Sequence, residues 1–308
     1  MPISLLADRG VVSVGGADAR GFLDGLLTCD MDRIAPGRPR FGALLTPQGK
    51  ILFDFHVHEA PDGDYRLDVL KPFAPDLAKR LGFYKLRAKV TVEDASDRFA
   101  VLAGWDGAAR PAGGDALAAD DPRLPGLGWR AIVPSPAPSS SAGAEAERRA
   151  EDDGAGEKGF APSAAYHAHR IALGVPEGGR DFLFGDAFPH EALMDQLHGV
   201  DFDKGCFVGQ EVVSRMQHRG TARTRMVPLV YLDGFATEPG VEVTAGERVI
   251  GRAGTGANGR GLAMLRLDRA ADALAAGEVL RAGGLPVRLE RPDWIAFPFP
   301  DAVRTTAA

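Results

Sequence analysis

One of the two cysteines of the chain lies in the segment KGCFVGQE, residues 204–211, where its surroundings favour a reactive thiolate. The spacing of apolar residues predicts a helix over residues 206–220, so Cys206 would occupy the first turn of that helix. Unpaired backbone N–H groups at a helix N-terminus and the nearby cation of Lys204 both lower the pKa of a thiol. The pattern is therefore typical of a thiol with raised thiolate character.

The alternative is that Cys206 is a small buried apolar residue, which is the common environment of a free cysteine. Gly205 and Gly209 favour the first interpretation because they leave space for another group to approach the backbone. From the residues alone the two interpretations are about equally supported. Cys29, inside the apolar run LLTCDM, is assigned to the buried alternative.

Basic side chains follow the thiol in a stretch without any acidic residue. They could bind carboxylates or phosphates, although a solvated helix end with cations near its C-terminus explains them nearly as well. A broad nucleic-acid surface is disfavoured because the chain has a formal net charge of −6. The stretch comprises Arg215, His218, Arg219, Arg223 and Arg225.

Two other patterns suggest ligand sites and are weaker. Residues 254–259, GTGANG, match GxGxxG, but a strand-like run follows and the Asn-Gly pair is a hairpin signal, so a dinucleotide site is rejected. His56 and His58 share one face of a predicted strand and could hold a metal. Polar residues on a solvated strand face are the better-supported interpretation, and no metal site is predicted.

The composition is that of a soluble globular protein, with 45% hydrophobic and 25% charged residues. No apolar run is long enough for a membrane span, and the N-terminal residues lack the pattern of a secretory signal. Two cysteines without paired spacing are typical of a reducing compartment, so a cytoplasmic location is expected.

Four parts are expected along the chain. An N-terminal α+β lobe covers residues 1–133 and includes a β-hairpin whose turn is Thr46-Pro47-Gln48-Gly49-Lys50. Residues 134–160 form a flexible low-complexity insertion, since they contain too few large apolar residues to offset their ordering entropy. Residues 161–225 form a central helical segment with the thiol motif. Short strands and Gly-rich turns over 226–308 predict a small β-barrel.

KGCFVGQE closely resembles the signature K-G-C-[YF]-x-G-Q-E of the YgfZ-type folate-binding proteins. Their mitochondrial relatives act in late iron–sulfur cluster assembly, and all belong to the aminomethyltransferase superfamily, named for the glycine cleavage T-protein. The likeness covers most of the chain apart from residues 106–160. It extends to LLTCDMDRIAPGRPRFGALLTPQGKILFDFHV, YHAHRIALGVPEGGRDF, FPHEALMDQLHGVDFD and VIGRAGT.

This resemblance implies an α+β fold, a ring of two interleaved α+β lobes and a small C-terminal β-barrel around a central pocket for tetrahydrofolate or a derivative. The aminomethyltransferases carry an Asp-Asp pair where this chain has Phe53-Asp54, so half of the pair is lost. One arginine of the T-protein is also missing, near Tyr166. The positions that the resemblance assigns to cofactor binding are Asp54, Arg170, Glu191, Lys204, Gln210 and Glu211.

The function implied first is that of a tetrahydrofolate-binding accessory protein for assembly or repair of [4Fe–4S] enzymes, including tRNA-modifying ones. Cys206 would be its functional thiol, kept ionised by Lys204. Its partners would be iron–sulfur cluster assembly proteins or client enzymes, without direct contact to nucleic acid or membrane, and the protein would be a monomer. The alternative is a tetrahydrofolate-dependent aminomethyl or one-carbon transferase, or a demethylase, with Asp54 as general base.

Overall fold

A computed structural model describes residues 1–111, 113, 116–135, 159–220 and 222–300. Nearly all of the expected low-complexity insertion lies outside these described residues. The chain divides into two compact units whose segments alternate along the sequence. Unit 1 comprises residues 1–45, 52–166 and 197–208, and unit 2 comprises residues 46–51, 167–196 and 209–308.

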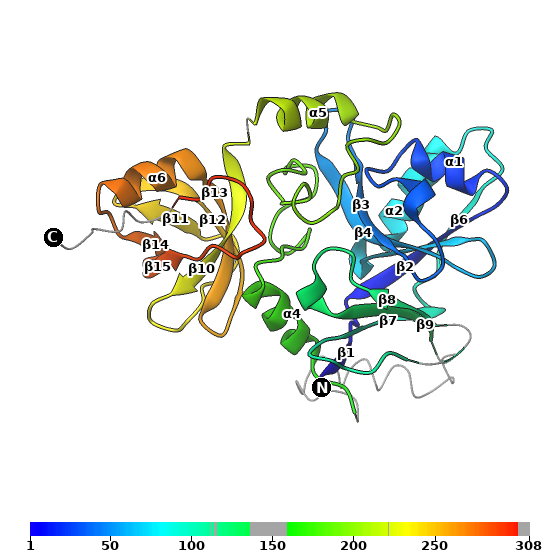
Figure 1. Ribbon diagram of the computed structural model, residues 1–308, viewed down its shortest axis with the longest axis horizontal. Helices are drawn as coiled ribbons and strands as arrows, with labels where there is room; N and C mark the ends of the chain where they lie inside the picture. Colours follow the sequence, from blue (N-terminus) through cyan, green and yellow to red (C-terminus); the bar gives the residue numbers. More distant parts are fainter. Residues whose placement is uncertain (112, 114–115, 136–158, 221, 301–308) are drawn as a thin grey trace. The chain divides into compact units, whose positions relative to one another are not determined.

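Unit 1 contains a five-stranded sheet with the strand order β3-β4-β5-β2-β6. Strands β2, β3, β4 and β6 of this sheet are labelled in Figure 1. The expected hairpin joins β3 to β4, and Gly49 in its turn has a φ of 80°, which favours glycine. Strand β2 has the sequence RGVVSVG and is buried along its whole length, with Val11, Val12 and Val14 in the core. The strands are β2 (Arg9–Gly15), β3 (Arg40–Leu45), β4 (Ile51–Glu59), β5 (Tyr65–Leu70) and β6 (Thr91–Asp94).

Helices pack on this sheet through apolar stripes. In α2, Ala74, Leu77 and Leu81 are buried at helical spacing and form the face that packs on the core. Helix α1 is shorter than its sequence suggests because the chain turns at Gly25, the residue at its C-cap. The helical segments are α1 (Ala19–Asp24), α2 (Ala74–Tyr84) and the short 3₁₀ turns η1 (Met31–Arg33) and η2 (Lys71–Phe73).

The second sheet of unit 1 has the order β1-β7-β9-β8, and all its pairings are antiparallel. Strands β8 and β9 were not expected from the sequence, in part because a Gly- and Ala-rich stretch separates them from β7. The strands are β1 (Ile3–Leu5), β7 (Phe99–Gly104), β8 (Leu117–Asp120) and β9 (Trp129–Pro134), with the 3₁₀ turn η3 (Pro125–Leu127) before β9.

A buried ionic cluster joins strands of the two sheets. The carboxylate of Asp68 on β5 accepts hydrogen bonds from Arg9 Nε at 2.6 Å and from Arg130 Nη2 at 2.7 Å. Arg130 and Arg123 both donate to the hydroxyl of Tyr166, at 2.8 and 3.0 Å. The Asp68 cluster, as it is called below, comprises Arg9, His56, Asp68, Asp121, Arg123, Arg130 and Tyr166.

The two strand histidines are buried rather than solvated, which contradicts the interpretation favoured from the sequence. The ring of His56 lies between Asp68 and Asp121, with nitrogen–oxygen distances of 3.6 and 3.7 Å. Burial, followed by the nearby arginines, lowers the pKa of His56 to about 3. Burial also lowers the pKa of His58 to about 4, so both rings are neutral at pH 7.

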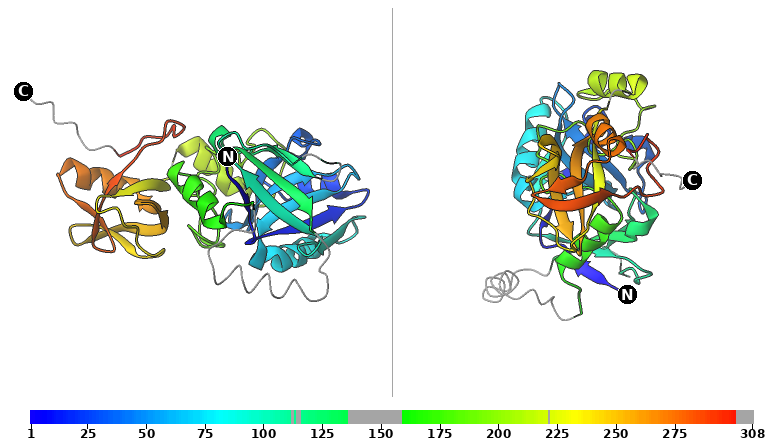
Figure 2. Two further views of the ribbon diagram at one scale, coloured as in Figure 1. Left: turned by 90° about the horizontal axis from the view of Figure 1, so that it is seen from below. Right: turned by 90° about the vertical axis from the view of Figure 1, so that its left-hand side faces the viewer.

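Unit 2 contains a closed six-stranded barrel with the order β10-β13-β12-β11-β14-β15, which confirms the expected C-terminal barrel. Figure 2 draws its strands in yellow to orange-red. Helix α6 packs on it through Ala270 and Ala273 and was not predicted. The strands are β10 (Thr224–Tyr231), β11 (Glu242–Ala245), β12 (Arg248–Ala257), β13 (Arg260–Arg266), β14 (Leu280–Ala282) and β15 (Leu285–Leu289). The helices are α6 (Leu267–Ala275), α5 (Gln210–Arg219) and α4 (Ser163–Ala172), whose first four residues belong to unit 1.

The GxGxxG segment forms a β-hairpin and does not open a helix. Asn258 and Gly259 connect β12 to β13 with φ angles of 51° and 71°, the left-handed pair that a tight hairpin turn requires. The rejection of a dinucleotide site is therefore confirmed. Among the described residues, no helix is both long and apolar enough to cross a bilayer.

The buried histidines make the stability of the protein depend on pH. Both pKa values are lower in the folded than in the unfolded chain, so the unfolded chain binds more protons as the pH falls below about 6.5. We expect the free energy of unfolding to fall between pH 6.5 and 4, by up to about 1.4 kcal/mol per histidine and pH unit. Urea denaturation at several pH values measures this slope.

The matched variants are His56→Gln and His218→Gln, the second of which changes an exposed histidine. His56→Gln should flatten the slope between pH 6.5 and 4, because one of the two buried rings no longer titrates. His218→Gln should leave the slope as it is in the wild type. Equal slopes in the wild type and the His56→Gln variant would show that His56 is not held neutral.

Candidate functional site

The thiol of Cys206 is exposed and lies outside the helix that was expected to hold it. Helix α5 begins only at Gln210, because Gly209 at its N-cap has a left-handed backbone with a φ of 82°. The expectation that Cys206 occupies the first helical turn is therefore wrong. The interpretation of Cys206 as a buried apolar residue is also wrong, since the side chain is solvent-accessible.

Lys204 is committed to backbone carbonyls and does not point freely into solvent. Its Nζ donates to the carbonyl oxygens of Asp24 at 2.6 Å, Leu27 at 2.9 Å and Cys29 at 2.9 Å. An ion pair with Asp24 Oδ1 at 3.0 Å adds to these bonds, and the Lys204 side chain is only 1% exposed. The Lys204 ammonium therefore stabilises the turn between α1 and η1.

The chain before Lys204 is attached to the same region of unit 1. Asp201 Oδ1 accepts from Arg33 at 2.9 Å and from Arg40 at 2.5 Å, 168 and 161 residues away along the chain. Asp201 Oδ2 accepts from the backbone N–H of Asp30 at 2.7 Å. Sequence reasoning missed these residues, because no local pattern links positions so far apart.

Cys29 is fully buried, which confirms its assignment from the sequence. It packs so closely on Gly42 that a Cβ at that glycine would lie 2.7 Å from the Cys29 sulfur. Burial raises the pKa of the Cys29 thiol to about 12, so the group is neutral and unreactive in the folded protein.

The glycine of the signature at 209 is required by a close approach within unit 2. A Cβ on Gly209 would lie 2.6 Å from the carbonyl oxygen of Thr46 and 3.0 Å from Cα of Gly49. The hairpin turn therefore packs directly against the start of α5. Both glycines also have positive φ angles. The close contact and the backbone conformation therefore each favour glycine at these two positions.

Gln210 and Glu211, which the resemblance assigned to cofactor binding, form the first turn of α5. A carboxylate in this position is stabilised by the unpaired N–H groups and the positive end of the helix. Glu211 also accepts a hydrogen bond from Arg215 at 2.6 Å, one turn further on, and both side chains are exposed.

The basic residues after the thiol do not form one continuous stripe. Arg225 is buried, donates to both carboxylate oxygens of Asp195 at 2.9 and 3.0 Å, and lies over the ring of Phe297. Arg215 is paired with Glu211. His218, Arg219 and Arg223 are exposed. The exposed cations therefore cluster at the C-terminal end of α5, where the helix dipole favours them.

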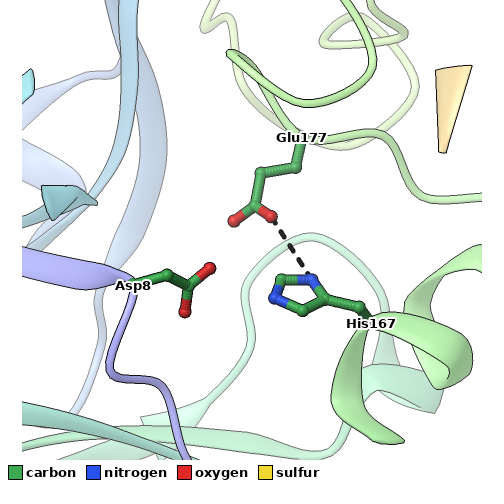
Figure 3. A group of neighbouring side chains, drawn as sticks. All are labelled: Asp8, His167 and Glu177. Carbon is green, nitrogen blue, oxygen red and sulfur yellow. Dashed lines mark ion pairs between the residues drawn. The ribbon is translucent and has the colours of Figure 1, made fainter. Parts of the chain in front are cut away.

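Arg170 is a buried structural cation of unit 2. It donates to Asp181 at 2.7 Å, to the hydroxyl of Thr255 at 3.0 Å and to His167 Nδ1 at 3.1 Å. The His167 ring also lies 3.6 Å from the carboxylate of Glu177, as Figure 3 shows. Because Thr255 belongs to β12, this network attaches α4 to the barrel.

Glu191 and Asp54, the other positions assigned by resemblance, are both substantially covered. Glu191 is half-buried and accepts from the Phe188 N–H at 2.9 Å, and burial raises the pKa of its carboxyl group. Lys50, whose ammonium lies 4.0 Å from the Phe188 ring, opposes that rise. Asp54 is 5% exposed on β4. The positions that the resemblance assigns to cofactor binding therefore have separate local surroundings within their units. The exceptions are positions that are adjacent in the signature, such as Gln210 and Glu211.

Comparison with known proteins identifies the family. The chain is 31% identical over 316 residues to the human mitochondrial iron–sulfur cluster assembly factor IBA57, covering 94% of this chain and 84% of that protein. The chain belongs to the IBA57 family. It is also 35% identical over 241 residues to the mitochondrial IBA57 homologue of Mycosarcoma maydis, and 31% identical over 256 residues to that of Neurospora crassa. The matches cover 73% and 77% of this chain but only 56% and 55% of those longer proteins.

Fold comparisons agree with this family. Residues 223–297 match the CAF17 C-terminal β-barrel domain. The structure also resembles the glycine cleavage system aminomethyltransferase T from Bartonella henselae, with a TM-score of 0.69 and 14% identity over 97% of this chain and 88% of that one. The aminomethyltransferase-like fold expected from the sequence is thereby confirmed.

Two expectations need correction in the light of these relatives. The IBA57 relatives named here are mitochondrial proteins, which contradicts the expected cytoplasmic location. The YgfZ-type resemblance identified the correct superfamily and the link to iron–sulfur assembly, but the relatives found are IBA57 proteins.

The two thiols should differ greatly in reactivity. Cys206 is exposed, whereas Cys29 can react only when the surrounding structure opens. We expect iodoacetamide to modify Cys206 faster than Cys29 by at least a factor on the order of 100, which corresponds to about 2.7 kcal/mol of opening free energy. Mass spectrometry that follows each cysteine separately measures the ratio, and unfolding in urea should abolish it. Similar rates in the folded protein would contradict the burial of Cys29.

Proposed function

We propose that this protein serves the assembly or repair of iron–sulfur enzymes through the thiol of Cys206. The main support is the contrast between Cys206 and the rest of its signature. Lys204 donates hydrogen bonds to backbone carbonyls, Phe207 is buried, and Gly209 makes a tight backbone contact. Each of these three residues therefore has a structural role. Cys206 itself is exposed, so packing does not account for a cysteine at this position.

The thiol would act in a complex with another protein. Iron–sulfur clusters are held by several cysteine thiolates, and the chain has only two cysteines, one of them fully buried. A cluster that contacts Cys206 must therefore take its remaining ligands from a partner. An assembly protein or a client enzyme would supply them, and clients would include [4Fe–4S] enzymes that modify tRNA.

Tetrahydrofolate or a derivative is the cofactor that we propose for this fold. The support is the likeness to an aminomethyltransferase and the surviving Asp54, Arg170 and Glu191. Glu191 fits a binding role best, because a half-buried carboxylate can accept hydrogen bonds from the amino and ring N–H groups of a pterin. Arg170 is bonded to Asp181, so its contribution would be to hold α4 in place.

A methylene transferase is the alternative activity, with Asp54 as general base. One observation disfavours it. Phe53, which replaces the first aspartate of the transferase pair, is 7% exposed and packs edge-on against Phe73 with 6.5 Å between ring centroids. An apolar contact thus replaces a carboxylate beside Asp54. Methylene transfer to tetrahydrofolate by the wild type, but not by Asp54→Asn, would support the transferase instead.

Substitution of the thiol should abolish function and leave the fold intact. Serine is nearly isosteric with cysteine but is a poor ligand for iron and a poor reducing group. In cells whose own factor is deleted, we expect Cys206→Ser to give [4Fe–4S] enzyme activities at the level of the deletion strain. The conservative control is Cys29→Ala, which removes the buried thiol and should support maturation if the protein folds. Full client activity with Cys206→Ser would rule out the proposed role.

Folate binding can be tested separately from the thiol. Titration with tetrahydrofolate should release measurable heat and raise the thermal midpoint of unfolding. A ligand at 100 times its dissociation constant adds about 2.7 kcal/mol of apparent stability. Glu191→Gln should weaken the binding, whereas Cys206→Ser should not change it. The absence of heat and of a thermal shift at millimolar folate would remove the cofactor from the proposal.

A further inference from the structure

Residues 204–207 of the signature consist of two exposed residues between two buried side chains. Lys204 and Phe207 are directed into unit 1, where the Lys204 side chain is 1% exposed and Phe207 is 7% exposed. Gly205 and Cys206, which lie between them, are both exposed. The Lys204 ammonium also lies 5.6 Å from the centroid of the Phe207 ring. The thiol therefore projects from a short loop that is held on both sides.

The ammonium of Lys204 has no N–H group left for the thiol. A lysine ammonium has three donors, and here three carbonyl oxygens lie at 2.6, 2.9 and 2.9 Å from Nζ. Its charge is balanced by Asp24 Oδ1 at 3.0 Å. A lysine that activated Cys206 directly would need a donor or an unbalanced charge directed at the sulfur.

The carbonyl cage is formed where α1 ends and the chain turns toward η1. Asp24 is the last residue of α1, and carbonyl groups at a helix C-terminus lack intrahelical donors. A cation in that position is favoured both by these carbonyls and by the negative end of the helix. Lys204 thus satisfies buried acceptors of a distant segment and ties the thiol loop to them.

We infer that Lys204 is a positioning residue for the Cys206 thiol and acts through its hydrogen bonds to the 24–29 turn rather than as an electrostatic activator. This inference rests on the proposed function of Cys206. Asp201, bonded to Arg33, Arg40 and the N–H of Asp30, fixes the preceding part of the loop in the same way. Together these contacts hold the thiol in a fixed position, so that a partner can place its own cluster ligands beside it.

The first test uses the wild-type protein. An acylating reagent such as acetic anhydride, followed by peptide mass spectrometry, compares Lys204 with Lys79, an exposed lysine of α2. We expect Lys204 to react more slowly than Lys79 by at least a factor on the order of 100, because its amine is reached only when the cage opens. Equal rates for the two lysines would show that the cage does not persist, and would overturn the inference.

The second test separates positioning from charge with Lys204→Met, and with Lys79→Met as the matched control. Positioning predicts roughly tenfold or more faster hydrogen exchange in residues 24–31 and 199–207, with exchange in α2 unchanged. It also predicts that the midpoint of Cys206 alkylation against pH stays in place while client maturation falls. If Lys204 instead activates the thiol by its charge, Lys204→Met should raise the midpoint of Cys206 alkylation by roughly one pH unit or more. Hydrogen exchange should then stay unchanged.

Hydrogen exchange in α2 reports whether a variant still folds, because α2 lies outside the segments that Lys204 is expected to hold. If Lys204→Met speeds exchange in α2, Asp201→Asn is the variant to use, since it loosens the loop while the Lys204 cation remains. Normal client maturation with folded Lys204→Met or Asp201→Asn, in an assay where Cys206→Ser is inactive, would overturn the inference and leave the proposed function standing. Full activity of Cys206→Ser would instead remove the proposed function itself.

Discussion

The buried carboxylate of Asp68 links the two sheets of unit 1. An ion removed from water is costly unless it is paired and hydrogen-bonded, so Asp68 on β5 requires Arg9 from β2 and Arg130 from β9 at bonding distance. Since β2 and β5 belong to one sheet and β9 to the other, this requirement sets how the two sheets face each other. The Asp68 cluster also holds the His56 ring in a site where burial and the neighbouring arginines keep it neutral.

The same rule explains why three cations singled out in the sequence have structural roles in this chain. Arg170 is bonded to Asp181, Arg225 to Asp195 and Lys204 to three backbone carbonyls. Each of these side chains is buried and satisfied by groups of its own unit. Cys206 differs from them because its thiol is exposed.

A fold shared with an aminomethyltransferase does not by itself determine the function, because function depends on particular sites rather than on the architecture. Position 53 illustrates this point. Where the transferases carry a carboxylate, this chain packs a phenyl ring against Phe73, and the adjacent Asp54 remains on β4. In the loop at Cys206, the contacts of Lys204 and Phe207 with unit 1 leave the thiol between them exposed.

The sequence by itself determined the features that depend on neighbouring residues: the barrel strands, the Asn258-Gly259 hairpin, helix α2 and the resemblance carried by KGCFVGQE. It misplaced the start of α5, because the left-handed backbone of Gly209 is imposed by the hairpin turn at Thr46 and Gly49. The burial of His56, the pairing of Arg225 and the carbonyl cage around Lys204 were decided only by tertiary structure. Each depends on partners that are distant in the chain, and no local pattern encodes which buried charge will meet which acceptor.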